Sequence, residues 1–107
     1  MDWFFLLTAG FLEVGWPIGL KISQTPEHRL TGIAIAVACI LGSGALLWLA
    51  QKTIPMGTAY AVWTGIGATG TFLVGITFFG DSSTPLRLGS AALIVAGLIG
   101  LKIAPQG

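Results

Sequence analysis

The chain has 107 residues, of which 54% are apolar and only 8% are charged, and its mean hydropathy is +0.89. Soluble domains carry about 25% charged residues, so this chain lacks the polar surface of a water-soluble globule and we expect it to lie in a lipid bilayer. Its net charge of +1 gives no basic surface for binding nucleic acid. A single cysteine, Cys39, excludes an intramolecular disulfide, and its apolar neighbours predict a packed, unreactive thiol.

Long runs without charge predict four membrane-spanning helices, because about 20 residues rising about 1.5 Å each cross a hydrocarbon core of about 30 Å. Short segments containing proline or glycine separate the runs, as is typical of turns at the membrane surface. The fold class is therefore an all-α membrane protein, with one four-helix transmembrane domain over residues 1–107. We place the helices at residues 2–22, 29–51, 56–79 and 86–104.

In the first helix, Glu13 is the one charged residue that lies well inside an apolar run. A charged carboxyl near the middle of a membrane costs about 3 kcal/mol or more, so such groups usually face a cavity and have a function. Burial favours the protonated form of a carboxyl group, which allows it to exchange a proton for a cation near neutral pH. This placement predicts proton-coupled transport. The structural alternative is a protonated glutamic acid that a neighbouring helix satisfies.

Three other residues of the first helix share a face with Glu13, because residues three and four apart are neighbours. Gly10 leaves room beside the carboxyl group, and the indole N–H of Trp16 can donate to it. Pro17 has no N–H, so the carbonyl of Glu13 loses its helical partner. We expect a kink there, with a water or hydroxyl bound to the freed carbonyl. Alternatively, Pro17 is absorbed as a mild bend without a role.

In the second helix, Ser43 is the best polar partner, flanked by glycine on both sides. Its hydroxyl can bond an acid on a neighbouring helix or the carbonyl four residues earlier in its own helix, and the second option is the more common one.

In the first half of the third helix, one face carries Tyr60, Trp63, Thr64 and Gly67. Aromatic residues at this spacing usually pack in the core or lie at the membrane surface, but these two fall several residues inside the span. We expect them to line a site, where an aromatic wall can flank a flat cation. Residues 65–70 match the pattern GxGxxG, but they lie in an apolar span without a preceding strand, so we do not expect a dinucleotide site. The glycines, Gly65 and Gly67 among them, predict a hinge instead.

In the fourth helix, Ser90 and Gly97 lie seven residues apart on one stripe that a second copy of the chain can contact. Packing within one chain is the alternative. The only histidine, His28, lies in a loop without other ligand residues around it, so no metal site is predicted.

The basic residues favour neither orientation in the membrane. Three fall at one end of the helices and two at the other, which leaves almost no bias under the positive-inside rule. A small membrane protein without bias is a candidate for dual topology, an antiparallel pair of identical chains. The basic residues are Lys21, Arg29 and Arg87 at one end and Lys52 and Lys102 at the other.

Over essentially its whole length, the chain resembles the small multidrug resistance family of transporters, and in particular its guanidinium-exporter branch. The Glu-x-x-Trp pairing in the first helix is the signal that separates this branch from the exporters of polyaromatic drugs. The matching segments are Gly10-Phe11-Leu12-Glu13-Val14-Gly15-Trp16, Gly19-Leu20-Lys21, the stretch from Pro55 to Gly67, and Gly100-Leu101-Lys102.

The resemblance implies an antiparallel, dual-topology homodimer in the bacterial cytoplasmic (inner) membrane, in which two copies of Glu13 share one site that opens alternately to either side. By the same resemblance, Trp16 and Ser43 hydrogen bond to Glu13, Tyr60 and Trp63 line the pocket, and Gly65 and Gly67 form a bend. Two departures from the family pattern affect the first helix: Pro17 replaces a small residue, and the first loop is about one residue longer.

These features predict a proton-coupled antiporter that exports guanidinium and small monosubstituted guanidinium cations. Guanidinium is planar and rich in N–H donors, and a carboxylate is its natural acceptor. Protons are the coupling ion, no other cofactor is expected, and nothing indicates an enzyme. The alternatives are a broader exporter of quaternary ammonium and other drug cations, a small dual-topology ion channel, and a subunit of a larger membrane complex.

Overall fold

The computed structural model of the chain describes residues 2–105. It contains four α-helices, and each helix bound lies within one residue of the bound expected from the sequence. All four are long and apolar enough to cross a membrane, which confirms the all-helical membrane fold. The elements in chain order are α1 (Asp2–Ile22), the short 3₁₀ helix η1 (Pro26–His28), α2 (Arg29–Ala50), α3 (Met56–Phe78) and α4 (Pro85–Ile103).

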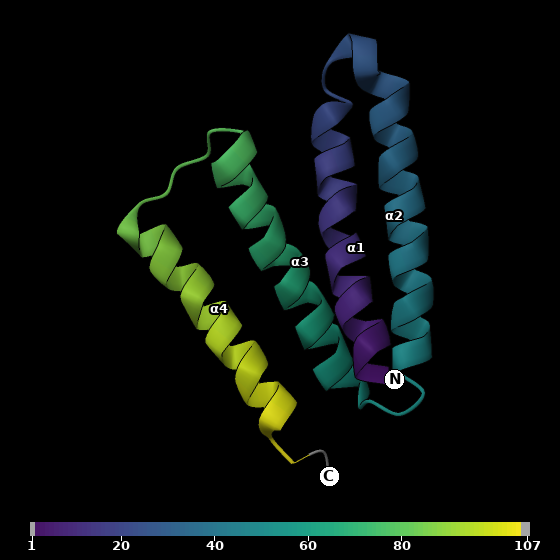
Figure 1. The fold of residues 1–107 in the computed structure, drawn as a ribbon, viewed down its shortest axis with the longest axis vertical. Helices are drawn as coiled ribbons and strands as arrows, with labels where there is room; N and C mark the ends of the chain where they lie inside the picture. The colour runs from purple at the N-terminus through teal and green to yellow at the C-terminus, as the bar shows by residue number, and fades with distance from the viewer. Residues whose placement is uncertain (1, 106–107) are drawn as a thin grey trace.

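Helix α1 is the centre of the arrangement (Figure 1). It packs against α2 on one side and α3 on the other, while α4 packs mainly against α3. Because α2 returns antiparallel to α1, helices α1 and α3 run in the same direction and end on the same side of the molecule. The C-terminal ends of these two helices are therefore neighbours.

Glycines bring α1 and α2 close together. A Cβ atom added to Gly19 would lie 2.7 Å from the backbone nitrogen of Ala36 and from the carbonyl oxygen of Gly32. One turn away, Gly15 faces the sulfur of Cys39, the free thiol of the chain. Small residues let membrane helices approach where no hydrophobic effect drives them together, so these positions fix the α1–α2 pair.

The buried apolar core lies at the end where α1 begins and α2 turns into α3. Its members are Leu6, Ala50, Ile54, Ala59 and Val62.

Polar contacts join the segments at the same end of the molecule. The hydroxyl of Thr53 donates to the carboxylate of Asp2. Lys52 lies over the ring of Trp48 at 4.8 Å, and Lys102 of α4 lies over the ring of Trp3 at 4.7 Å. These contacts hold the first turns of α1 and the last turn of α4 to the rest of the molecule.

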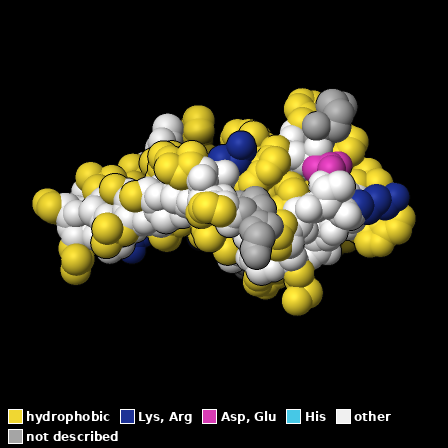
Figure 2. Space-filling view, turned by 90° about the horizontal axis from the view of Figure 1, so that it is seen from below, with side chains coloured by type: hydrophobic (Ala, Val, Ile, Leu, Met, Phe, Trp, Pro, Cys, Tyr) yellow, Lys and Arg dark blue, Asp and Glu magenta, His cyan; other side chains and the backbone are white. Residues whose placement is uncertain are grey.

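Within the described part of the chain, α4 has no buried residue. Leu86, Leu93 and Ile103 are each at least 75% exposed. Figure 2 shows that hydrophobic side chains cover much of the face seen there and that few charged side chains interrupt them. Such a surface needs lipid or another protein to cover it.

Candidate functional site

Glu13 of α1 points at α3, where Gly67 makes room for it. A Cβ atom added to Gly67 would overlap the side chain of Glu13, and Gly67 itself is buried. Helix α3 runs unbroken from Met56 to Phe78 through the glycine-rich segment. In this structure, then, Gly67 provides space for the carboxyl group, and the hinge remains a prediction.

One oxygen of the Glu13 carboxyl group, Oε1, is buried without a hydrogen-bond partner in the part of the chain that the structure describes. The carboxyl group therefore keeps an unused acceptor. Trp16, one turn along α1, lines the same groove as Glu13. The groove beside it has a volume of about 290 Å³ and is lined by Glu13, Trp16, Pro17, Thr64, Gly67, Ala68 and Thr71.

Pro17 forms part of the groove wall, and α1 continues through it as one helix. The sequence predicted a water or hydroxyl on the carbonyl of Glu13. Among residues 2–105, no side-chain hydroxyl donates to that carbonyl. The contribution of Pro17 that the structure shows is its ring, which lines the groove.

Ser43 joins three helices through two short hydrogen bonds. Its fully buried hydroxyl donates to the carbonyl oxygen of Ala9 in α1 at 2.6 Å and accepts from the indole Nε1 of Trp63 in α3 at 2.7 Å. The sequence suggested either an acid on another helix or the serine's own helix as the partner, and the structure shows neither. Ala9 lies one turn before Glu13, so Ser43 and Trp63 fix the position of the helix segment that carries the acid.

Tyr60 and Trp63 form an aromatic pair, with ring centroids 5.5 Å apart. Neither side chain lines the groove. Tyr60 is 57% exposed, and Trp63 packs against the apolar core. A single chain therefore brings Glu13, Trp16, Pro17 and Gly67 together and places the aromatic pair in a neighbouring cluster.

The remaining positions from the sequence lie at helix contacts or on the outer surface. Gly10 faces Ile66 of α3, and Gly65 faces Leu98 of α4, so each makes room for a neighbouring helix. On α4, the hydroxyl of Ser90 donates to the carbonyl of Leu86 in its own helix at 2.8 Å. A Cβ atom added to Gly97 would meet no heavy atom within 4 Å. Both α4 positions are exposed and free to meet another chain.

Sequence reasoning missed Thr71, which lines the groove with Glu13. Its hydroxyl is buried and has no hydrogen-bond partner among the described residues. The sequence spacing could have predicted this position, because Thr64, Gly67 and Thr71 follow one another at helical intervals on the same face of α3. In the same described range, no group of His, Cys, Asp and Glu side chains is placed to hold a metal ion.

Comparison with known proteins agrees with the resemblance seen in the sequence. A family described as "Small Multidrug Resistance protein" matches residues 1–96. The chain belongs to the small multidrug resistance family. It is 52% identical over 103 residues to the guanidinium exporter of Escherichia coli K12, and this match covers 96% of this chain and 97% of the relative. The guanidinium exporters of Citrobacter freundii and Salmonella typhimurium are 53% identical, with the same coverage.

Membership of this family and the four apolar helices place the chain as a multi-pass protein of the bacterial inner membrane. The names of the family and its relatives are those of membrane transporters.

Proposed function

We propose that this protein is a proton-coupled antiporter that exports guanidinium and small monosubstituted guanidinium cations. The observation that carries the proposal is the Glu13 carboxyl group, which lies half-buried in the middle of a membrane helix beside a groove, with one buried oxygen that has no hydrogen-bond partner among the described residues. The similarity to relatives named guanidinium exporters supports this choice of substrate.

The chemistry of the site suits a planar cation with N–H donors. A carboxylate accepts two parallel hydrogen bonds from such an ion, and Glu13 is the one acidic residue that lines the groove among the described residues. The Trp16 indole lines the same groove one turn along α1, where its N–H can donate to the carboxyl group. A proton on the same group removes the charge that attracts the cation, so the proton and the cation exclude each other.

We further propose that two chains pair antiparallel and share one site. The exposed α4 surface and the exposed ring of Tyr60 support an interface with a second copy. Two copies of Glu13 then bind either protons or one cation in a site that opens to one side of the membrane at a time. Because each conformational change carries only one kind of occupant, inward proton movement drives cation export.

Proteoliposomes test this function. Wild-type protein is expected to exchange guanidinium for protons, whereas Glu13→Gln is expected to lose exchange by about 100-fold or more while still forming a dimer. Glu27→Gln is a matched control, because Glu27 lies in η1 outside the groove. Proton-coupled guanidinium uptake that persists in Glu13→Gln would refute the proposal.

The same assay separates the rival functions. Transport of tetraethylammonium at rates similar to guanidinium would indicate a broader drug-cation exporter, since this ion has no N–H to donate to Glu13. Guanidinium flux that continues without proton exchange, at rates far above those of transporters, would indicate a channel.

A further inference from the structure

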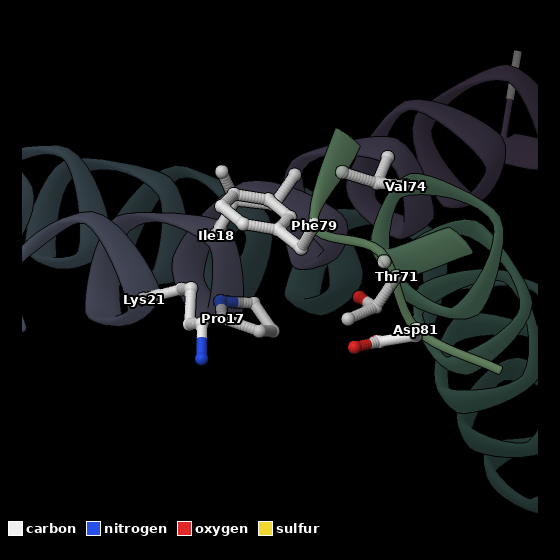
Figure 3. Close-up of a pocket in the computed structure, with 8 residues that line it drawn as sticks. Pro17, Ile18, Lys21, Thr71, Val74, Phe79 and Asp81 are labelled. Carbon is white, nitrogen blue, oxygen red and sulfur yellow. The ribbon is translucent and has the colours of Figure 1, made fainter. Parts of the chain in front are cut away.

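The groove beside Glu13 extends toward the ends of α1 and α3. A second hollow, with a volume of about 200 Å³, adjoins the first, and both are lined by Pro17 and Thr71. Figure 3 shows this outer part, with Lys21 on one side and Asp81 on the other. Its remaining lining residues are Ile18, Val74, Gly75 and Phe79.

The backbone holds Asp81 over this outer hollow. Gly80 has a φ of +72°, a left-handed conformation that glycine adopts without strain, and it turns the chain back after α3. The backbone N–H of Asp81 then donates to the carbonyl oxygen of Gly75 at 3.0 Å. Gly75 has no side chain, and a Cβ there would overlap the Asp81 carboxylate. The carboxylate therefore rests on the last turns of α3.

Two helix ends add negative potential near Asp81. Helix C-termini carry partial negative charge, and α1 and α3 both end here. The start of α4 at Pro85 and the basic residues of this end act in the opposite sense, so the local group that attracts a cation is the Asp81 carboxylate itself. Yet in residues 2–105 no side chain donates to the Asp81 carboxylate, and no ion pair forms there.

The basic residues near this end are not bound to Asp81. Nε of Arg87 donates to the carbonyl of Ser82 at 2.7 Å, and its guanidinium group lies 5.0 Å from the ring centre of Phe72. Nε of Arg29 donates to the carbonyl of Ser23 at 3.5 Å. Among the described residues that line the hollow with Asp81, Lys21 is the only basic one.

We propose that Asp81 is an outer binding site for guanidinium-type cations, at the mouth of the groove that leads past Thr71 to Glu13. The identity of the ligand rests on the proposed function. Asp81 accepts N–H donors of the cation, and Thr71 lines both hollows on the way to Glu13. When no cation is bound, Lys21 balances the charge of Asp81. When a cation binds to Asp81, Lys21 repels it and lowers the affinity.

Direct binding tests the site without relying on transport. In the Glu13→Gln protein in detergent micelles, guanidinium chloride is expected to shift the amide NMR signals of Gly80 and Asp81 in a saturable way, with sodium chloride as the reference. Adding Asp81→Asn should abolish the saturable shift, and adding Lys21→Gln should tighten binding several-fold. Adding Glu27→Gln should leave the saturable shift and the affinity unchanged. The proposal is overturned by equal shifts in the Asp81→Asn protein or by the same shifts with sodium chloride.

Transport measures what the site contributes. On the wild-type background, Asp81→Asn is expected to raise the KM for guanidinium by about tenfold at low ionic strength, because a charged mouth concentrates its substrate. The rate at saturating guanidinium should stay the same, and Asp81→Glu should restore the KM. At about 0.15 M salt the difference in KM between the wild type and Asp81→Asn should shrink, because exposed charges are screened.

These two experiments keep the two proposals apart. A wild-type protein that does not exchange guanidinium for protons refutes the proposed function, while the NMR titration still decides whether Asp81 binds the cation. Normal wild-type exchange with an unchanged KM in Asp81→Asn at low ionic strength contradicts the outer site alone.

Discussion

At the scale of single residues, the contact between Gly67 and Glu13 sets the geometry of the acid. Alanine at position 67 would place a methyl group where the Glu13 side chain lies. The carboxyl group would then have to move relative to Trp16 and the groove. Glycine at this position thus serves the site, although alanine favours a helix by about 1 kcal/mol.

We therefore predict that Gly67→Ala lowers the initial rate of guanidinium exchange in proteoliposomes by about tenfold or more. Gly57→Ala in the same helix is the control, because a Cβ there meets no heavy atom within 4 Å. It should retain the wild-type rate. A Gly67→Ala protein as fast as the control would show that the site tolerates the displaced carboxyl group.

The part of the site that lies within one helix could be predicted from the sequence. Trp16 and Pro17 follow Glu13 at helical spacing, and both line its groove. Partners across helices could not be predicted, because they depend on the rotation and axial offset of one helix against another. Ser43 is an example, since its hydroxyl bonds the backbone of Ala9, and backbone groups carry no sequence signal.

At the scale of the helices, Ser43 connects α1, α2 and α3. Replacing it by alanine would remove the second donor to the Ala9 carbonyl and leave the part-buried indole N–H of Trp63 without its partner. Buried polar groups without partners cost about 1–3 kcal/mol each, so this single hydroxyl contributes to the packing of three helices.

Ser43→Ala is accordingly expected to lower the free energy of unfolding in detergent by about 1–3 kcal/mol, measured by tryptophan fluorescence during denaturation. Ser90→Ala removes a hydroxyl that bonds only its own helix on the exposed α4, and it should change stability by less than about 0.5 kcal/mol. If both variants unfold alike, the contact between helices contributes nothing measurable.

The lengths of the helices were readable from the sequence, but their order in space was not. A bilayer requires every backbone polar group to be satisfied within the helix, so each apolar run has to be helical over nearly its whole length. Apolar residues on all sides of a helix, by contrast, do not indicate which side meets a neighbour. The central place of α1 between α2 and α3 therefore emerges only in the structure.

At the scale of the whole molecule, the basic residues are split almost evenly between the two ends of the helices. Arg29 and Arg87 donate to backbone carbonyls at one end of the molecule, while Lys52 and Lys102 lie over aromatic rings at the other. With so small a difference between the ends, a few added charges are enough to set one orientation.

We predict that Gln24→Arg with Thr25→Arg sets one orientation, and that Gln51→Arg with Thr53→Arg sets the opposite one. Cells that express either double variant alone should lose resistance to guanidinium, because an antiparallel pair needs both orientations. Expressing the two together should restore it. Full resistance from either variant alone would contradict the antiparallel pair.

The two lysine–tryptophan contacts also bear on how the protein responds to the lipids around it. Indole rings prefer the level of the lipid headgroups, so we expect Trp3 and Trp48, each under a lysine, to fix the depth of that end of the protein. A thicker or thinner bilayer is then accommodated mainly at the far end, where α1 and α3 terminate. We expect acyl-chain length to change how deep Lys21 and Asp81 sit while leaving the tryptophan end in place.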